Sequence, residues 1–291
     1  MPRPGRLGIG VVGAGKVGAV LGAALRAAEH AVVGVHAVSE ASRERAEALL
    51  PGVPILPIPD LVRRAELVLL AVPDDALGPL VKGLADAGHW QAGQLVVHTA
   101  GRYGTGILEP ARAAGAIPLA IHPAMSFTGM SLDLTRLQDC MFGVTADRMM
   151  LPIAQALVVE MGAEYAVIEE EDRGIYHAAL AHASNHLVTI AGQSAQLLRI
   201  AGVERPDRVL GPLMRASLEN ALSSGEGALT GPVARGDVGT VAIHRDALAK
   251  DAVSPDVRDA YLSMARATAQ RALARGLLTE AQAAAILDAL A

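Results

Sequence analysis

Short apolar runs alternate with longer helix-compatible segments over the first half of the chain. The apolar runs cover residues 7–12, 31–38, 67–72, 95–98 and 117–121. This alternation continues to about residue 147 and is typical of a doubly wound parallel β-sheet with helices on both faces. We therefore predict an α/β domain over residues 1–160.

The pattern changes after about residue 162, where apolar positions recur at helical spacing over long stretches. Residues 172–201 contain no proline and are followed by Gly202, which is a common residue at the end of a helix. Further helical stretches cover residues 207–222, 255–275 and 279–290. These patterns predict an all-α C-terminal domain over residues 161–291.

The C-terminal half also predicts self-association. It is rich in Ala and Leu, and the apolar faces of its predicted helices exceed what one small helical domain can bury. A homodimer is the commonest way to cover such a surface. We therefore expect a homodimer built mainly by residues after about 165.

The first apolar run leads directly into the segment Gly13-Ala14-Gly15-Lys16-Val17-Gly18. In a dinucleotide fingerprint of this spacing, the first Gly permits a tight bend and the second lets the backbone approach a pyrophosphate. The third lets the helix pack closely on the strand. Backbone N–H groups and the helix dipole then hold the phosphates. The position between an apolar run and a helical segment favours a dinucleotide site over a structural glycine turn, so we expect residues 13–17 to contact the cofactor.

Hydroxyl and guanidinium side chains follow the second predicted strand, namely Ser39, Ser42, Arg43 and Arg45. A carboxylate about 20 residues after the fingerprint would bind the ribose 2′-hydroxyl of NAD and repel a 2′-phosphate. The groups found here suit a phosphate instead, so the sequence favours NADP(H). Two observations weaken this interpretation. Ser39 could simply cap the next helix, and Glu40 would repel a phosphate unless its side chain points away.

Polar residues, Gly and Pro also follow the later predicted strands. The three segments are Pro73-Asp74-Asp75, Thr99-Ala100-Gly101 and His122-Pro123-Ala124-Met125-Ser126. Each could be an ordinary turn. However, the carboxyl ends of the strands form the ligand-binding edge of an open α/β sheet. We therefore expect Val72, Pro73, Asp74 and Thr99 to contact the cofactor.

A polar stripe runs along the long helix predicted over residues 172–201. His182, Asn185 and Thr189 are spaced so that they share one face of an otherwise apolar helix. Buried amide and imidazole groups are costly unless they are hydrogen-bonded. The stripe therefore belongs either to a polar network in the core or to a ligand site.

Composition excludes several classes of partner and site. The net charge is −5 and aromatic residues make up 2% of the chain, whereas nucleic-acid surfaces need basic stripes and stacking rings. The one cysteine, Cys140, cannot form an internal disulfide and fits a reducing compartment. The nine histidines are scattered without the spacing of a metal site, so we expect no metal.

The N-terminus superficially resembles a secretory leader, because Arg3 and Arg6 precede an apolar stretch. Frequent glycines and Lys16 interrupt that stretch, and the dinucleotide turn explains the same residues better. Elsewhere the chain has no run of about 18 uncharged apolar residues, the length that a membrane span requires. We expect a cytoplasmic protein that contacts neither membrane nor nucleic acid.

Together with the fingerprint, several segments resemble a known superfamily. They are Ala71-Val72-Pro73-Asp74, His122-Pro123, His177-Ala178-Ala179, Ala183-Ser184-Asn185 and Leu229-Thr230-Gly231-Pro232-Val233-Ala234-Arg235-Gly236-Asp237. The chain resembles the Rossmann-like oxidoreductases that include β-hydroxyacid dehydrogenases, ketopantoate reductases and pyrroline-carboxylate reductases. It is more similar to a subfamily whose C-terminal half is a domain of unknown function. The resemblance covers nearly the whole chain, and residues 229–237 are its most specific segment.

The resemblance implies an NADPH-dependent reductase that transfers a hydride to a small oxo acid, with ketopantoate as the leading substrate. Reduction of an imine, oxidation of a β-hydroxyacid and a non-catalytic redox sensor remain alternatives. Asn185 would bind the substrate oxygen, and Ser126 and Arg235 would bind its carboxylate, with His177 and Thr189 nearby. Arg235 could instead pair with Asp237 in the loop.

The proton donor departs from the pattern of the relatives. In the β-hydroxyacid dehydrogenases and ketopantoate reductases that the chain resembles, a Lys one helical turn before the Asn acts as the general acid, and here that position is Ala181. The neighbouring His182 projects to nearly the same face and could protonate a developing alkoxide, since imidazole has a pKa of about 6.5. His122 and His177 are rival candidates for this role. The substitution also keeps open the possibility that no chemistry occurs.

Overall fold

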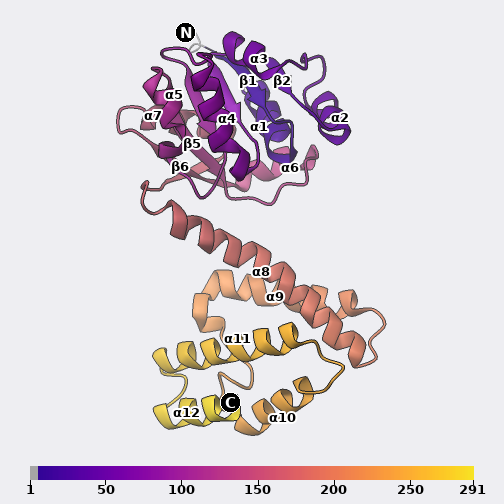
Figure 1. The fold of residues 1–291 in the computed structure, drawn as a ribbon. Helices are drawn as coiled ribbons and strands as arrows, with labels where there is room; N and C mark the ends of the chain where they lie inside the picture. The colour runs from indigo at the N-terminus through magenta and orange to yellow at the C-terminus, as the bar shows by residue number, and fades with distance from the viewer. Residues whose placement is uncertain (1–5) are drawn as a thin grey trace. The chain divides into compact units, whose positions relative to one another are not determined.

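The computed structural model describes residues 6–291, so Arg3 of the leader-like segment lies outside the described residues. Contacts divide the chain into two compact units, one that ends at Ser184 and one that runs from Asn185 to Ala291. The first unit is an α/β domain and the second consists of helices (Figure 1). The domain boundary expected after residue 160 falls between a helix and the last strand of the sheet, and the contact boundary lies within a long helix.

The described part of the first unit contains a seven-stranded sheet in the order β2-β1-β3-β4-β5-β6-β7. Its first five strands are parallel and correspond to the five predicted apolar runs. They are β1 (Gly8–Val12), β2 (Ala31–His36), β3 (Leu67–Leu70), β4 (Leu95–His98) and β5 (Ile117–Pro123). Every residue of β3 and β4 is buried, as expected for central strands that are covered on both faces.

Two further strands extend the sheet beyond the predicted parallel part. β6 (Met141–Ala146) pairs antiparallel with β5, and β7 (Glu164–Val167) pairs parallel with β6. The sheet is therefore mostly, but not entirely, parallel. The connection between β5 and β6 contains no helix long enough to carry the chain back across the sheet, only α6 (Leu132–Arg136) and a short 3-10 turn, so β6 runs opposite to β5.

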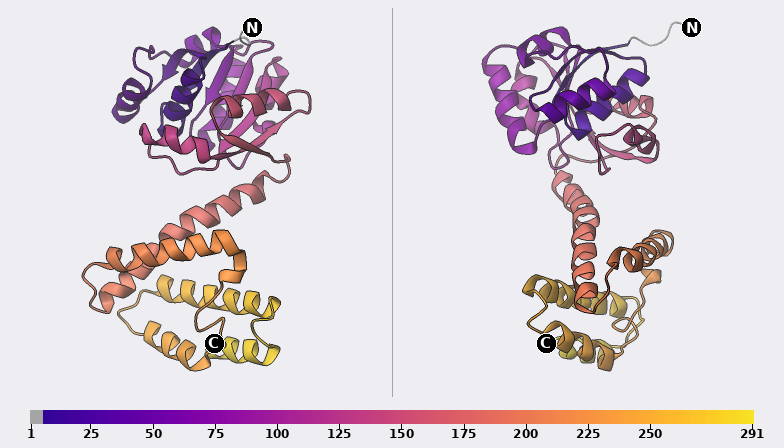
Figure 2. Two further views of the ribbon diagram at one scale, coloured as in Figure 1. Left: turned by 180° about the vertical axis from the view of Figure 1, so that it is seen from behind. Right: turned by 90° about the vertical axis from the view of Figure 1, so that its right-hand side faces the viewer.

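Helices cover both faces of the sheet and bury two separate apolar clusters (Figures 1 and 2). One cluster packs under α1 (Lys16–Ala27), α2 (Glu40–Leu49) and α7 (Leu151–Glu160). The opposite cluster packs under α3 (Ile58–Arg64), α4 (Asp74–Asp86) and α5 (Glu109–Ala113). This two-sided burial holds the carboxyl ends of β1, β3, β4 and β5 at a common edge.

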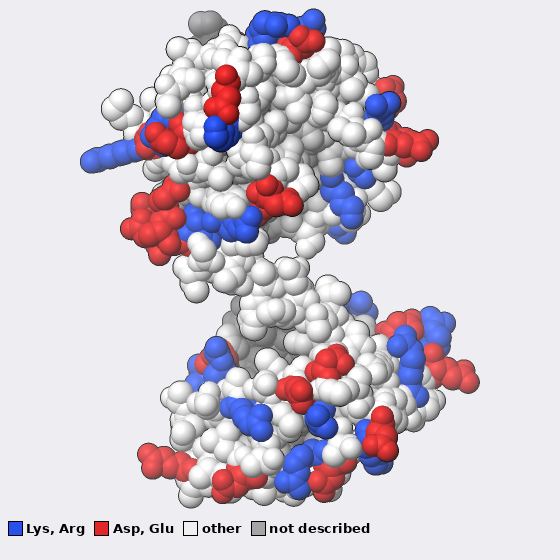
Figure 3. Space-filling model, in the orientation of Figure 1, with Lys and Arg blue, Asp and Glu red and all other residues white. Residues whose placement is uncertain are grey.

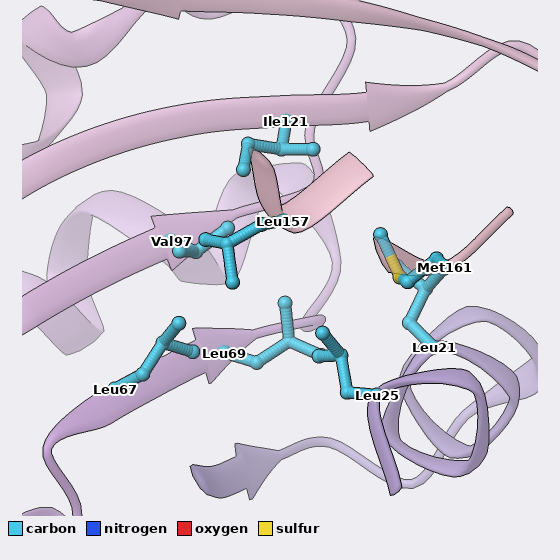
Figure 4. Close-up of a pocket in the computed structure, with 8 residues that line it drawn as sticks. All are labelled: Leu21, Leu25, Leu67, Leu69, Val97, Ile121, Leu157 and Met161. Carbon is cyan, nitrogen blue, oxygen red and sulfur yellow. The ribbon is translucent and has the colours of Figure 1, made fainter. Parts of the chain in front are cut away.

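A small cavity lies inside the first cluster, between the sheet and helices α1 and α7 (Figure 4). Its lining is entirely apolar and consists of Leu21, Leu25, Leu67, Leu69, Val97, Ile121, Leu157 and Met161. The volume of about 20 Å³ is close to that of a single water molecule, and the lining offers no polar partner. This cavity is a packing defect of the core and not a ligand site.

The second unit is helical, as predicted. α8 (Arg173–Ile200) begins in the first unit and continues into the second, followed by α9 (Pro206–Ser224), α11 (Pro255–Ala274) and α12 (Glu280–Ala289). These match the four predicted helical stretches to within a few residues. α10 (Val238–Leu248) was not predicted, and its residues pack with α11 and α12 in an apolar cluster around Val241, Ala269 and Ile286.

Helices α8 and α9 each have a single fully buried residue within this chain. Arg173 is the one buried residue of α8, and Pro206 is the one buried residue of α9. No Lys, Arg, Asp or Glu occurs between residues 174 and 198.

The charged side chains of the described residues do not form one large patch on the face shown in Figure 3. Acidic and basic side chains are mixed there in small groups, as expected for the modest net charge of −5. Among the described helices, none has both the length and the apolar character that crossing a membrane requires.

Candidate functional site

The turn between β1 and α1 has the geometry that its three glycines predict. Gly13 adopts a φ of +100°, which L side chains rarely adopt, and the N–H groups of Gly13 and Ala14 both donate to the carbonyl of His36 in β2. A Cβ atom on Gly18 would lie 2.0 Å from the carbonyl oxygen of Gly13, so α1 can approach β1 only because position 18 is glycine. These two glycines therefore shape the turn.

Gly15 differs from its two neighbours, because it faces open space. A Cβ atom built on Gly15 would meet nothing within 4 Å. Gly15 also precedes the first turn of α1, where the N–H groups of Lys16 and Val17 have no partner within the helix. The first turn of a helix attracts anions, because its N–H groups and the helix dipole point in the same direction. The turn thus leaves room for a phosphate where the fingerprint places one.

The segment after β2 forms a helix cap. The Ser39 hydroxyl accepts from the N–H of Ser42, and the Ser42 hydroxyl donates to the Ser39 carbonyl at 2.7 Å. Ser42 is buried, so its hydroxyl is engaged in the cap and is not directed toward a ligand. Arg43 is exposed, and Arg45 reaches back to donate to the Ala14 carbonyl at 3.1 Å. Arg45 therefore braces the glycine turn, a contact that its sequence position does not reveal.

A loop after β5 lies against the same turn. A Cβ atom on Gly129 would lie 3.0 Å from Cγ of Lys16 and 2.6 Å from Nε of Arg45, so this loop touches both cationic side chains. The buried carboxylate of Asp133 holds the loop by accepting from the N–H groups of Thr128 and Gly129. Ser126, a predicted substrate ligand, is exposed just before this loop.

Residues after β3 and β4 meet at the adjoining part of the edge. Pro73 precedes α4, and Asp74 in the first turn of that helix pairs with Arg102 at 3.2 Å. Thr99 is half-buried directly after β4, and its N–H donates to the carbonyl of Leu70. The structure therefore brings Asp74 and Thr99 to the carboxyl ends of neighbouring strands, where the sequence places cofactor contacts.

His98 shapes the loop that follows β4. Its ring is fully buried, its Nδ1 accepts from the N–H of Ala100, and its Nε2 lies 2.7 Å from the carbonyl of Gly104. Both contacts are satisfied only when Nε2 carries the proton, so His98 is neutral. Burial lowers its pKa to about 4, which agrees with this tautomer. His98 thereby fixes the backbone that presents Gly101.

Two imidazoles and a phenol gather beside Gly101. His122, at the end of β5, lies 3.0 Å through Nδ1 from the hydroxyl of Tyr176 in α8. The rings of His122 and His177 are perpendicular, with centroids 6.2 Å apart. A Cβ atom on Gly101 would lie 2.7 Å from Cδ2 of His177 and 2.9 Å from Nε2 of His122. The missing side chain at position 101 makes the space that both rings occupy.

A buried guanidinium lies behind this cluster. Arg173, the first residue of α8, donates through Nε to the Thr145 hydroxyl and through one terminal nitrogen to the carbonyls of Ala120 and Gly143. Its Cζ lies 5.6 Å from the centroid of the Tyr176 ring. The other terminal nitrogen is buried without a hydrogen-bond partner among the described residues. Arg173 therefore places a buried positive charge next to the aromatic cluster.

Burial and this charge set the protonation states of the cluster. Burial, and after it the charge of Arg173 and the neighbouring imidazoles of His177 and His98, lower the pKa of His122 to about 4. Burial raises the pKa of Tyr176, while Arg173 and the backbone of Gly143 act in the opposite direction. At neutral pH the pair therefore consists of an uncharged imidazole and an uncharged phenol.

The remaining predicted residues follow His177 along the chain. His182 is exposed on α8 within the first unit, whereas Asn185, Thr189 and Arg235 belong to the second unit. The Thr189 hydroxyl donates to the carbonyl of Asn185 at 3.3 Å. Arg235 is exposed and forms no ion pair with Asp237 among the described residues. Asp237 instead caps α10 by accepting from Thr240.

The sequence missed the residues that surround His122. Tyr176 and Arg173 lie on the predicted long helix, but helical spacing does not indicate which face of that helix contacts β5 and β6. Gly101 was read as part of a turn. A signal was nevertheless present: Arg173 and Tyr176 are three residues apart and therefore share a helix face, and His177 follows directly.

Comparison with known proteins identifies both halves of the chain. Residues 2–123 match the Rossmann-like domain family, and residues 140–268 match a domain of unknown function, DUF2520. A search of curated protein sequences finds no match.

Solved structures have a similar fold over nearly the whole chain. BF3122 from Bacteroides fragilis, to which NADP oxidoreductase activity is ascribed, is 21% identical with a TM-score of 0.74 and covers 90% of this chain and 98% of its own. Protein TM1727 from Thermotoga maritima is 25% identical with a TM-score of 0.67, and the match covers 92% of this chain and 99% of TM1727. An imine reductase from Myxococcus stipitatus, determined with NADP+, is 16% identical with a TM-score of 0.67. The match covers 93% of this chain and 100% of the reductase.

The glycine turn predicts opposite effects for two similar substitutions. Gly15→Ala adds a methyl group to open space at a φ of −70°, so we expect unfolding stability to stay within about 0.5 kcal/mol of the parent. Its NADPH affinity should nevertheless fall roughly tenfold, because the methyl group occupies the space that faces a phosphate. Gly18→Ala should instead lose about 1–3 kcal/mol of stability by steric overlap. Urea titration and fluorescence titration measure these quantities, and unchanged NADPH affinity in Gly15→Ala would contradict the assignment.

The buried histidines predict that the domain loses stability in mild acid. The pKa values of His98 and His122 are about 4 in the fold, against about 6.5 in an unfolded chain. Between these values the unfolded state binds more protons, so the free energy of unfolding falls as the pH falls, by up to about 1.4 kcal/mol per pH unit for each histidine. We expect urea midpoints, followed by Trp90 fluorescence, to fall between pH 6.5 and 5. A slope that is the same in His98→Gln and His122→Gln as in the parent would disprove this origin.

Proposed function

We propose that this protein is an NADP(H)-dependent oxidoreductase that transfers a hydride between the nicotinamide and a carbonyl or imine carbon of a small substrate. The observation that carries the proposal is the β1–α1 turn, in which Gly13 and Gly18 are sterically required while Gly15 faces open space. This combination is what close approach of a pyrophosphate demands. The structures of NADP-linked reductases with a similar fold support it.

The chain offers a set of groups for each part of the cofactor. The N–H groups of Gly15, Lys16 and Val17 suit the pyrophosphate, and the exposed guanidinium of Arg43 suits a 2′-phosphate near the cap at Ser39. Residues at the ends of β3 and β4, including Pro73 and Thr99, suit the remainder of the dinucleotide. When bound, the nicotinamide supplies the hydride, and the protein supplies orientation and electrostatics.

For the substrate, we propose a small oxo acid, with ketopantoate as the first compound to test. A carboxylate would be bound by Ser126 and Arg235, and Asn185 with Thr189 would contact the reacting oxygen, with a histidine as the proton donor. The candidates for the donor are His122, His177 and His182. Arg235 is exposed and forms no ion pair with Asp237 among the described residues, which supports its availability for an anion.

An imine substrate is the second candidate, and a structural similarity favours it. The Myxococcus stipitatus imine reductase has a similar fold and was determined with NADP+. The replacement of the expected Lys by Ala181 also fits, because reduction of an iminium ion needs less help from a strong acid than reduction of a ketone. We propose that the protein acts in the cytoplasm in either case.

Oxidation of NADPH in the presence of a substrate panel tests the proposal. The panel should contain ketopantoate, other 2-oxo acids and a cyclic imine carboxylate, and consumption of NADPH is followed by its absorbance. Saturable turnover with any member supports the enzyme, and the preferred member identifies the class. Tight NADPH binding with no turnover on the whole panel would overturn the enzymatic proposal in favour of a redox sensor.

The β2–α2 segment predicts the choice of cofactor. Because Ser39 stands where a carboxylate would bind the ribose of NAD, and Arg43 is exposed nearby, NADPH should bind more tightly than NADH by at least about 1.4 kcal/mol, a factor of ten. Arg43→Ala should abolish this preference. Arg45→Ala is the matched control: Arg45 braces the turn through Ala14, so its loss should weaken both cofactors equally. Equal affinity for the two cofactors in the parent protein would refute NADP(H) specificity.

We further propose that the protein is a homodimer. α8 and α9 together span 47 residues, 28 and 19, yet each buries a single residue within the chain. Val188 and Leu222 are 73% and 80% exposed, and Leu213 is 60% exposed. Exposed apolar side chains in this number are often covered by another protein surface, and a second copy is the commonest partner.

Light scattering at micromolar concentration should therefore return about twice the chain mass of 30.0 kDa. Val188→Glu places a charge on the exposed apolar face of α8 and should shift the mass toward that of one chain. Met149→Glu changes a side chain of similar exposure, 81%, in the first unit and should leave the mass unchanged. A parent protein with a mass near 30.0 kDa would rule out the dimer.

A further inference from the structure

We propose that His122 and Tyr176 form a proton relay. In this relay, Nε2 of a neutral His122 donates its proton to the substrate, and the Tyr176 hydroxyl donates its proton to Nδ1 of His122. Arg173 is the counter-charge for the phenolate that the relay leaves behind. This inference rests on the proposed reductase function and deepens it, because it singles out one donor among the three candidate histidines. It also assigns roles to two residues that the sequence did not indicate.

The geometry of the pair restricts how His122 can act. Its Nδ1 lies 3.0 Å from the Tyr176 hydroxyl, and the two rings are nearly perpendicular at 89°. Nε2 has no hydrogen-bond partner among the described residues. One nitrogen is thus committed to the protein, and the other is the atom that can bind a ligand.

The direction of the hydrogen bond follows from the chemistry of the two groups. A phenol, with a pKa of about 10, is a much stronger donor than a neutral imidazole N–H, and the imidazole nitrogen is the stronger acceptor. Tyr176 therefore donates to Nδ1, and the proton of His122 stays on Nε2. This is the same tautomer that His98 adopts nearby, where its two backbone partners determine it.

The charges around His122 keep it neutral. The groups that act on it electrostatically are His98 at the end of β4 and Arg173 and His177 on α8, together with its partner Tyr176, and none of them is a carboxylate. The nearest acidic influence is Glu170, which acts on Arg173 and His98 and is engaged by the N–H groups of Thr105 and Gly106. An imidazolium at position 122 would therefore face only positive or neutral groups.

A neutral imidazole that gave up its Nε2 proton alone would become an imidazolate, which is an unfavourable anion, and Tyr176 removes this difficulty. As the hydride reaches the substrate carbon, the substrate oxygen or nitrogen takes the proton from Nε2. At the same time, Nδ1 takes the proton of the Tyr176 hydroxyl. His122 ends the step neutral, and the charge appears as a phenolate on Tyr176, whose ring lies 5.6 Å from the Arg173 guanidinium. That guanidinium is the nearest fixed positive charge, so the phenolate is stabilised where it forms.

Tyr176 is also placed to recover its proton. Besides contacting His122, Tyr176 lines a surface hollow of about 380 Å³ on the side of β7, together with Asp172 and Glu169. Water in such a hollow can return a proton to the phenolate between turnovers. His122 then regains its starting tautomer when Nε2 takes a proton from water and Nδ1 releases one. The residue therefore lies between the ligand-facing imidazole and solvent.

Nitrogen NMR of protein with ¹⁵N-labelled histidine tests the tautomer without any substrate. We expect His122, assigned by its loss in His122→Gln, to be the Nε2–H tautomer and to stay uncharged between pH 5.5 and 8. In Tyr176→Phe its two tautomers should mix. An Nδ1–H tautomer or an imidazolium at pH 7 in the parent would overturn the inference, even if turnover is observed with some other donor.

Turnover then tests the relay. Tyr176→Phe should lower kcat by roughly 10²-fold or more, because positioned proton transfer contributes on that scale, while NADPH affinity stays unchanged. Tyr261→Phe is the matched control, since that hydroxyl lies 2.7 Å from Nδ1 of His244 in the second unit, and its kcat should equal that of the parent. Full activity in Tyr176→Phe, or a large loss in His182→Ala with none in His122→Gln, would overturn the relay. Absence of turnover in the parent would refute the reductase function and the relay alike, and the NMR result would still decide the tautomer.

Discussion

The buried guanidinium of Arg173 is the interaction on which the candidate site depends. Burying a charge is costly unless hydrogen bonds compensate it, and here the partners are the carbonyls of Ala120 in β5 and Gly143 in β6, with the Thr145 hydroxyl. Those groups come from two strands that pair antiparallel, with Ala120 opposite Thr145 and His122 opposite Gly143. One side chain thus ties the first turn of α8 to a specific register of β5 and β6.

That attachment has a chemical consequence. Because Arg173 is held at the start of α8, Tyr176 and His177 on the next turn meet His122 at the end of β5. The same charge that anchors the helix also lowers the pKa of His122 and favours ionisation of Tyr176. Structural anchoring and tuning of the site are therefore two effects of one residue.

Missing side chains define the ligand-facing edge as much as the side chains that are present. Gly13 and Gly18 are required for packing, since any Cβ there would overlap the backbone. Gly15 and Gly101 leave space, in one case open and in the other filled by two imidazoles. Composition alone treats all four as turn residues, and only the distances to neighbouring atoms separate their roles.

The sequence by itself determined the features that depend on contiguous residues. Apolar runs placed the five parallel strands because central strands are buried on both faces, and helical periodicity placed α8, α9, α11 and α12. The fingerprint placed the turn at residues 13–18, because three glycines close together in the sequence provide the tight bend, the space for a phosphate and the close packing of helix on strand. β7 escaped prediction because most of its four residues are exposed, so it lacks the apolar signal of the other strands. α10 escaped because its first turns contain Gly and β-branched residues, which disfavour a helix locally.

Only the tertiary structure decided which distant residues work together. His122 and Tyr176 are 54 residues apart, and their contact depends on the antiparallel pairing of β5 and β6 and on the burial of Arg173. Neither is a local property of the chain. The sequence could show that three histidines and a polar helix face were available, but not which imidazole would become partly buried and face a phenol. Periodicity describes one element at a time, whereas a protonation state depends on everything packed around the group.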